Sequence, residues 1–459
     1  MSTRSAERRG AERLACTFAG RASHVFLREN GESWSVGRLL AYAADMARAV
    51  PAEAGPVVAV RSDTAAFLVA SLLALWQTGR SPLLVDPAIT SEPSGLRARG
   101  SRMPVLAPAE AADPWADVAV VESGGAPINP RFPAGDEAEV AFFTSGSTGE
   151  PKIVRKNAYQ FAEQHAVEAP WLGLSGRPLS ALCFVPAFHI LGYIYGFDMP
   201  ACSAGSTLFC RSSAPQDWID EIRVRPPDVV VAVPLHYRLM TQVLTTPLPP
   251  ATYVSSGGPL DPVVGAEFHR LAGSSVLQVY GSTETGGIAT RRGSEPWQLF
   301  PGLEWQCRES DSRLLVKSAW QDRADEWCAT GDAAVAEGET FRLLGRADSV
   351  VKVGGRRFST GEVVQTVLTE PAIQQAHAVV YERFGETAVA LFVVGCKDVR
   401  LTAADVRRLL ARRLAPFKVP RTIKVLAALP ARGLGKVDED ALRSLISPHA
   451  STLESGIES

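Results

Sequence analysis

A nine-residue segment rich in glycine and hydroxyl groups has the composition of a phosphate-binding loop. Its residues are Thr144, Ser145, Gly146, Ser147, Thr148, Gly149, Glu150, Pro151 and Lys152. Glycines let the backbone approach a ligand closely, and exposed N–H groups in such a loop bind anions. The hydroxyls and Lys152 add hydrogen-bond donors and a positive charge. The segment directly follows the apolar run 140–143, which argues against a flexible linker.

Two other motifs with glycine and hydroxyl groups are excluded by the spacing. A Walker loop requires Ser or Thr after its lysine, and here Ile153 follows Lys152. A nucleophile elbow requires glycine two residues before the serine, and Ser145 holds that place before Ser147. The segment therefore predicts a different kind of nucleotide site.

Two further apolar runs also end in glycine-containing loops. The run 276–279 leads into Tyr280–Thr285 (YGSTET), and the run 253–254 leads into Ser255–Gly258. The carboxylate of Glu284 is a hard oxygen ligand suited to Mg²⁺. Ligands of open α/β sheets bind beyond the carboxyl ends of the strands, so three such loops at one edge predict one site. Asp332, in Thr-Gly-Asp, can accept hydrogen bonds from a pair of hydroxyls.

In this order along the chain, the motifs resemble those of the adenylate-forming (ANL) superfamily of acyl-CoA synthetases, peptide-synthetase adenylation domains and luciferases. The resemblance covers most of the chain and implies an acyl- or aryl-CoA synthetase-like ligase that uses ATP and Mg²⁺. It implies that Tyr280 packs on adenine, Thr283 contacts the α-phosphate, Glu284 holds Mg²⁺ and Asp332 binds the ribose. The residues that it assigns to the nucleotide are Thr144, Ser145, Gly146, Ser147, Thr148, Gly149, Lys152, Gly258, Tyr280, Gly281, Ser282, Thr283, Asp332 and Arg346.

The segment from Gly345, GRADSVVKVGGRRF, resembles the family's hinge between a large and a small domain. The resemblance implies that Asp348 is the hinge and that Lys352 faces the site during thioester formation. Ser349 stands where the family has a second Asp, and Phe358 replaces the usual Ile or Val. Near the end, LAPFKVP and GLGKVD resemble the closing motifs of the small domain, and they make Lys436 the candidate catalytic lysine.

His189, in PAFHILG, matches a histidine that lines the carboxylate end of the acyl pocket in the acyl- and aryl-CoA ligases; a packed core histidine is the alternative. Amino-acid-activating relatives carry an Asp after the aromatic residue, and here His189 follows Phe188. Ile190, Tyr193 and the glycines 258 and 281 suggest an apolar pocket. An aryl or acyl acid is therefore favoured over an amino acid.

The implied reaction joins a carboxylate to AMP, with release of pyrophosphate, and then transfers the acyl group to a thiol. The thiol belongs to CoA or to the phosphopantetheine of an acyl carrier protein, and the sequence does not choose between them. Three alternatives remain: an amino-acid adenylation domain, a related enzyme that cyclises a hydroxy acid, and a nucleotide-binding protein without ligase activity. The acid, the pathway and the oligomeric state stay open.

Composition agrees with a globular cytoplasmic enzyme. The 459 residues are 46% hydrophobic and carry a formal net charge of -2, so no charge excess favours nucleic acid. Seven scattered cysteines without a Cys-x-x-Cys pair argue against disulfides and structural zinc. The first residues lack the apolar core of a signal peptide. The longest apolar stretch, 65–76, is too short to span a membrane and predicts a buried helix.

The pattern of helices and strands that must position these residues predicts an α/β fold. Apolar runs at 56–60 and 81–85 predict strands around the helix that begins at Ala65, with an N-cap among 62–64. The segment 403–414 predicts a later helix. We expect a large N-terminal domain of several sheets, residues 1–345, that binds AMP and the acyl group. A small mobile α+β lid domain, residues 346–459, follows.

Overall fold

The computed structural model describes residues 18, 21–89, 104–111, 117–120, 122, 125–128, 139–144, 152–321, 323–353, 356–368, 370, 372–383, 386–396, 400–432 and 436–446. The chain divides into two compact units. The first comprises Met1–Trp305 and Val316–Cys328, and the second comprises Gln306–Leu315 and Ala329–Ser459. The domain boundary predicted at residue 345 lies within the second unit. It stays a prediction, because compactness does not show where the chain rotates.

The first unit contains two extensive, largely parallel sheets. One has the order β15 (Gln298–Leu299), β14 (Gly286–Arg292), β13 (Val276–Ser282), β12 (Thr252–Ser255), β11 (Val229–Ala232), β9 (Ser180–Cys183), β10 (Ser206–Phe209), β1 (Val25–Glu29) and β2 (Glu32–Ser35). The other has the order β6 (Val118–Val120), β5 (Val105–Pro108), β3 (Val57–Arg61), β4 (Ser81–Val85), β7 (Val140–Thr144) and β8 (Lys152–Lys156). In the first sheet β1 and β9 to β13 are mutually parallel, so their carboxyl ends share one edge.

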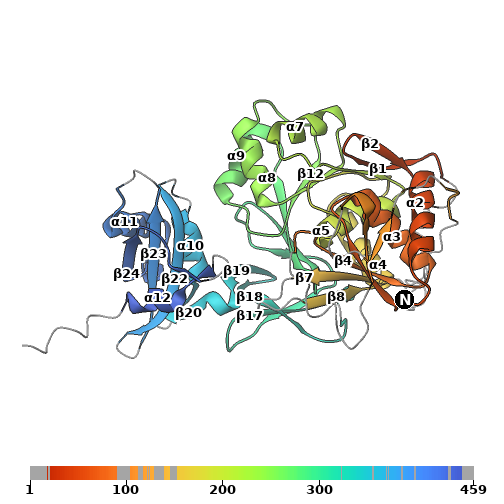
Figure 1. The fold of residues 1–459 in the computed structure, drawn as a ribbon. Helices are drawn as coiled ribbons and strands as arrows, with labels where there is room; N and C mark the ends of the chain where they lie inside the picture. The colour runs from red at the N-terminus through yellow and green to blue at the C-terminus, as the bar shows by residue number, and fades with distance from the viewer. Residues whose placement is uncertain are drawn as a thin grey trace, which may run out of the picture. The chain divides into compact units, whose positions relative to one another are not determined.

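The apolar stretch 65–76 forms helix α3 (Ala65–Gln77), as predicted, and its first twelve residues are buried. The helix contacts β1 of one sheet and β3 and β4 of the other, which explains why it is apolar on every side. Helix α2 (Val36–Ala49) packs beside it (Figure 1). Among the described residues, none of the helices is long and apolar enough to cross a bilayer.

The remaining helices of the first unit connect and cover the strands. They are η2 (Ala109–Ala111), α4 (Ala158–Trp171), α5 (Ile190–Tyr193), η4 (Ile194–Asp198), α6 (Met199–Cys202), α7 (Pro215–Val224), α8 (Pro234–Val243) and α9 (Pro262–Ala272). Segments α5, η4 and α6 follow one another without a break, and η4 is a π-helix. Helices α7, α8 and α9 lie next to one another (Figure 1).

The later part of the chain is a smaller α+β arrangement. Its elements are β16 (Glu304–Cys307), β17 (Arg313–Lys317), β18 (Cys328–Glu337), β19 (Thr340–Arg346), η5 (Ala347–Ser349), β20 (Val350–Val353), β21 (Arg356–Ser359), α10 (Thr360–Leu368), β22 (Ile373–Arg383), β23 (Glu386–Gly395), α11 (Ala403–Arg413), η6 (Pro416–Lys418), β24 (Thr422–Leu426), β25 (Ala431–Arg432), β26 (Lys436–Val437) and α12 (Glu439–Ser444). Phe358 belongs to its core, with its ring 6.1 Å from that of Phe417. The helix predicted at 403–414 is confirmed as α11.

Candidate active site

The motif Tyr280–Thr285 forms a tight turn between β13 and the antiparallel strand β14. Two residues of the motif lock this turn through reciprocal hydrogen bonds. The backbone N–H of Ser282 donates to Oγ1 of Thr285 (3.0 Å), and the N–H of Thr285 donates to Oγ of Ser282 (3.2 Å). Thr285 is buried, whereas Thr283 and Glu284 are partly exposed. The turn therefore presents a hydroxyl and a carboxylate at the carboxyl end of a parallel strand.

The turn depends on glycine at position 281. A Cβ there would lie 2.2 Å from the carbonyl oxygen of Gly286, which is far below van der Waals contact. Next to it, the ring of Tyr280 lies 5.5 Å from that of Trp297, and the Arg291 guanidinium lies 4.4 Å above the same indole. Packing against Trp297 fixes the orientation of the Tyr280 ring. A fixed aromatic ring is suited to stacking on a flat heterocycle such as adenine.

The strands on either side of the predicted phosphate loop belong to the other sheet. Thr144 ends β7 and Lys152 begins β8, and the two residues pair across the antiparallel ladder. The predicted loop residues Ser145, Gly146, Ser147, Thr148 and Gly149 lie outside the described residues. Thr144 and Lys152, which flank these residues, are thus held opposite each other by the pairing of β7 with β8. Lys152 is exposed.

The expectation that three loops share one sheet edge is only partly correct. Strands β12 and β13 are parallel neighbours, so the loop carrying Gly258 lies beside the Tyr280–Thr285 turn at one edge. Strand β7 belongs to the six-stranded sheet instead, because it pairs with β4 and β8. Adjacency along a sheet depends on pairing between distant segments, and the apolar runs alone do not specify it.

His189 stands at the start of α5 and is exposed, which contradicts the alternative of a packed core histidine. Its ring lies 4.5 Å from that of Phe188. Desolvation by neighbouring groups lowers the pKa of His189, and the carboxylate of Asp86 partly opposes this shift. The imidazole is therefore mainly neutral at pH 7. By contrast, Tyr193 is fully buried, with its ring near those of Phe142 and Phe161.

A cavity of about 690 Å³ lies directly beside the His189 segment, in the first unit. Its walls combine strand ends of both sheets with helices α7 and α8. Its apolar lining includes Phe184, Val185, Phe188, Trp218, Leu235 and Leu239. Its ionisable lining residues include Glu29, Asp63, Asp86 and Arg211. The volume is in the range of small-molecule sites, and the lining is mostly apolar with a few polar groups, as such sites are.

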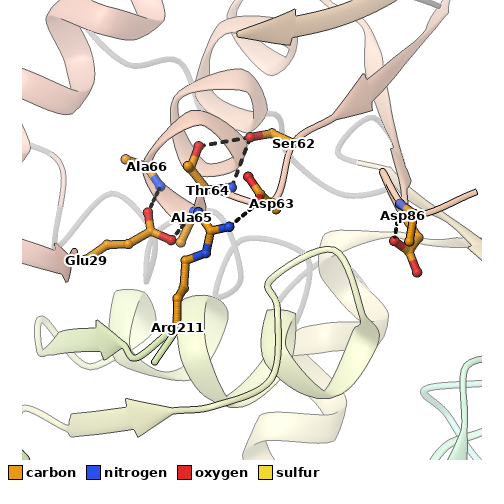
Figure 2. Close-up of polar contacts among 9 residues, drawn as sticks. Glu29, Ser62, Asp63, Thr64, Ala65, Ala66, Asp86 and Arg211 are labelled. Atoms are coloured by element: carbon orange, nitrogen blue, oxygen red, sulfur yellow. Dashed lines mark hydrogen bonds and ion pairs between the residues drawn. The ribbon is translucent and has the colours of Figure 1, made fainter. Parts of the chain in front are cut away.

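Figure 2 shows how the ionisable residues of this cavity are held. Arg211 forms an ion pair with Asp63. Glu29, from the end of β1, accepts hydrogen bonds from the N–H groups of Ala65 (3.0 Å) and Ala66 (3.3 Å) and so caps α3. Burial raises the pKa of Glu29, against the effect of these two donors. Oδ1 of Asp86 accepts from the N–H of its own turn, at position 88.

In the second unit, the structure brings together the two predicted nucleotide residues Asp332 and Arg346. They pair across β18 and β19, with Nη1 of Arg346 3.7 Å from Oδ1 of Asp332. The N–H of Asp332 donates to Oγ1 of Thr330 (3.2 Å). A Cβ at position 331 would lie 2.2 Å from the Arg346 guanidinium, so glycine allows the arginine to lie across the strand.

Family models match both parts of the chain. The model described as AMP-binding enzyme matches residues 3–309, and that described as AMP-binding enzyme C-terminal domain matches residues 362–436. The chain belongs to the AMP-binding enzyme family. The predicted superfamily and α/β fold class are thereby confirmed.

Individual relatives of this AMP-binding enzyme are distant. The indoleacetate–CoA ligase of Aromatoleum aromaticum is 27% identical over 348 residues, which is 66% of this chain and 66% of the relative. A 4-coumarate–CoA ligase of Cereibacter sphaeroides is 29% identical over 317 residues, 66% of this chain and 71% of the relative. The AMP complex of the Bacillus subtilis O-succinylbenzoate coenzyme A synthetase superposes with a TM-score of 0.77 at 20% identity, covering 93% and 96% of the two chains.

The predicted hinge residue Asp348 and the two predicted site lysines, Lys352 for thioester formation and Lys436 for adenylation, lie in the second unit of this AMP-binding enzyme. Asp348 lies in η5, between β19 and β20. Lys352 is exposed on β20. Lys436 begins β26, where its main chain pairs with Arg432. The glycines 354, 355, 433 and 435 lie outside the described residues. The roles predicted for these residues stay predictions.

Sequence reasoning missed the polar residues of the cavity. The N-cap was expected among 62–64, and Thr64 does occupy that position, but its side chain makes no capping hydrogen bond. The capping carboxylate comes from Glu29, on another strand. The one local signal for Glu29 is its position as a charged residue at the end of a mainly apolar strand. Arg211, just beyond the end of β10, carries the same signal.

Proposed function

We propose that this AMP-binding enzyme is an AMP-forming acid–thiol ligase. It activates an aryl or acyl acid as an acyl-adenylate, with release of pyrophosphate, and transfers the acyl group to the thiol of CoA or of a carrier-protein phosphopantetheine. The observation that carries the proposal is the locked turn that presents Thr283 and Glu284 beside the fixed ring of Tyr280. The named relatives that act on indoleacetate and 4-coumarate support an aryl acid.

In the first half-reaction, the acid's carboxylate attacks the α-phosphorus of ATP and pyrophosphate departs. The protein contributes positioning and charge stabilisation. The 144–152 loop holds the β- and γ-phosphates, Thr283 holds the α-phosphate, and Lys436 orients the carboxylate against it. The partly exposed Glu284 carboxylate fits Mg²⁺, which when bound neutralises phosphate charge. Asp332 and Arg346 hold the nucleotide.

In the second half-reaction, the thiol attacks the adenylate's carbonyl carbon and AMP departs. Between the two half-reactions, residues 346–459 rotate about Asp348 in this proposal. The rotation withdraws Lys436 from the site and brings Lys352 to it. The thiol arm reaches the carbonyl through the 690 Å³ cavity, because Phe188, next to His189, lines that cavity. We place the enzyme in a reducing, cytoplasmic location, because its seven scattered cysteines include no Cys-x-x-Cys pair.

Carboxylate-dependent ATP–pyrophosphate exchange over aryl, fatty and amino acids tests the proposal. We expect exchange with aryl or acyl acids. Lys436→Ala should abolish exchange and spare ATP binding, while the control Lys424→Ala should leave both intact. ATP binding without exchange for any acid would instead support a non-catalytic nucleotide-binding protein.

Two variants separate the half-reactions. Asp348→Pro should preserve exchange and block thioester formation, because it restricts the proposed hinge. Leu239→Trp should also preserve exchange and raise the apparent KM for the thiol, because it fills part of the cavity. Normal thioester formation in Asp348→Pro would refute the hinge, and an unchanged apparent KM for the thiol in Leu239→Trp would refute the route through the cavity.

A further inference from the structure

Helix α8 carries a histidine on the wall of the 690 Å³ cavity that no predicted motif contains. His236 lies in the first turn of the helix and is partly buried. It lines the cavity together with Leu235 and Leu239 of the same helix. The same cavity is lined by Phe188, next to His189, so His236 borders the space that leads to the proposed acid site.

The ring of His236 is held in one orientation. It stacks on the ring of Phe184, with centroids 5.4 Å apart and planes 21° apart. The ring of Trp218 lies 4.8 Å away at 60°. The backbone N–H of Val233 donates a hydrogen bond to Nδ1 (3.2 Å). Two aromatic neighbours and one hydrogen bond therefore fix which edge of the imidazole is turned towards the protein.

The other ring nitrogen is a hydrogen-bond donor that opens on the cavity. Because Nδ1 accepts, the proton of the neutral imidazole lies on Nε2. Desolvation lowers the pKa of His236, so the ring is mainly neutral at pH 7. Within the described part of the chain, Nε2 makes no hydrogen bond, and it is not an enclosed atom. The cavity wall thus presents an uncharged N–H group.

Two other donors of the cavity wall already have acceptors within the protein. Arg211 forms its ion pair with Asp63 (Figure 2). The indole N–H of Trp218 donates to the carbonyl oxygen of Ser212 (2.7 Å). A ligand acceptor that enters the cavity can therefore bond to Nε2 of His236 without displacing a contact of these groups.

The remaining polar groups of the cavity complement this donor. The carboxyl groups of Glu29 and Asp86 line the cavity and are acceptors, and most of the other walls are apolar. Acidic walls disfavour an anion inside the cavity, whereas an amide offers a carbonyl acceptor and an N–H donor without charge. Pantetheine is an uncharged chain that contains amide groups and ends in a thiol. The cavity therefore suits the pantetheine arm, with the phosphate groups of CoA or of a carrier-bound phosphopantetheine outside it.

We propose that Nε2 of His236 donates a hydrogen bond to an amide carbonyl of the pantetheine arm and so positions the thiol in the cavity. This inference rests on the proposed function, because it assumes that the thiol arm enters through this cavity. His236 is a positioning residue in this proposal and takes no part in proton transfer at the reacting atoms. It acts only in the second half-reaction.

Variants of His236 test the hydrogen bond. His236→Phe removes the N–H but keeps an aromatic ring against Phe184 and Trp218. It should leave ATP–pyrophosphate exchange unchanged and raise the KM for the thiol about 5- to 10-fold, as expected for one hydrogen bond. His236→Gln places an amide N–H near the position of Nε2 and should restore part of the loss. The control His269→Phe, at an exposed position on the neighbouring helix α9, should change neither quantity.

Analogues of the arm separate positioning from a structural role. The probes are pantetheine and analogues in which each –CO–NH– unit in turn is replaced by –CH2–CH2–. For the analogue that lacks the contacted carbonyl, wild type and His236→Phe should have the same KM. With CoA and with a phosphopantetheine-loaded carrier protein, tested side by side, the loss in His236→Phe should appear with whichever supports turnover.

The opposite results are equally clear. An unchanged KM in His236→Phe, or an equal loss with every analogue, would overturn the inference and leave the proposed function standing, because exchange does not involve the thiol. Exchange with no acid, or no thioester with any of these thiols, would overturn the proposed function as well.

Discussion

The contact between Gly287 and Glu168 allows a quantitative test of the packing around the Tyr280–Thr285 turn. In Gly287→Ala, the new methyl group would lie 1.9 Å from Oε1 of Glu168 and 2.9 Å from the Phe300 ring, where ordinary contacts are 3.4–4 Å. Overpacking of this kind costs about 1–3 kcal/mol. Displacing the carboxyl from Tyr195 and Gln164 loses two buried hydrogen bonds of about 1 kcal/mol each. We therefore expect a total destabilisation of about 3–5 kcal/mol.

A double-mutant cycle identifies the source of this cost. In a Glu168→Ala background, the closest obstacle is gone and the nearest remaining one is the edge of the Phe300 ring. The cost of Gly287→Ala should then fall to about 1 kcal/mol, which gives a coupling of about 2–4 kcal/mol. Urea unfolding followed by tryptophan fluorescence is suitable, because all nine tryptophans belong to the first unit. Additive costs, within about 0.5 kcal/mol, would refute the contact.

Three other perturbations address separate features. Thr285→Val removes the hydroxyl that holds Ser282, so exchange should slow about 10-fold while stability changes by about 1 kcal/mol; unchanged exchange would show that the turn needs no such lock. Glu29→Ala removes the capping acceptor of α3 and should lower the free energy of unfolding by about 1 kcal/mol in urea titrations, and no loss would contradict the cap. Because burial raises the pKa of Glu168, its contribution to stability is fully present below about pH 4.5 and is lost as pH rises through the folded-state pKa. The stability of wild type relative to Glu168→Gln should therefore fall with rising pH, and a pH-independent difference would rule this out.

The features that the sequence predicted correctly are those that a short window of residues determines. The twelve apolar residues from Ala65 specify a buried helix, because no face of it could tolerate water. Thr402 and Asp405 begin α11 with reciprocal capping hydrogen bonds, a pattern contained within four residues. The turn Tyr280–Thr285 is equally local, because glycine and hydroxyl groups close it from within.

The features that the sequence could not predict join residues far apart in the chain. Glu29 caps a helix that begins 36 residues later, and Tyr195 donates to a carboxyl group 27 residues earlier. Neither contact leaves a periodic pattern, since each requires only one polar residue at one position. Glu168 in particular lies on a helix whose polar and apolar residues alternate too irregularly to mark a buried face, although it is fully enclosed. Its environment depends on η4 and β14.

Gly286 and Gly287, which follow the Tyr280–Thr285 motif, are each required for a different structural reason. No predicted motif contains Gly286 or Gly287. In the structure, Gly286 has φ +68° and turns the chain out of the nucleotide turn, while Gly287 makes room for the carboxyl group of Glu168 behind it. One short segment thus joins the Tyr280–Thr285 turn to the buried carboxyl group of Glu168. A side chain at Gly287 would displace the Glu168 carboxyl group without touching the motif, so the packing behind the turn and the hydrogen bonds within it should be separable by mutation at neighbouring positions.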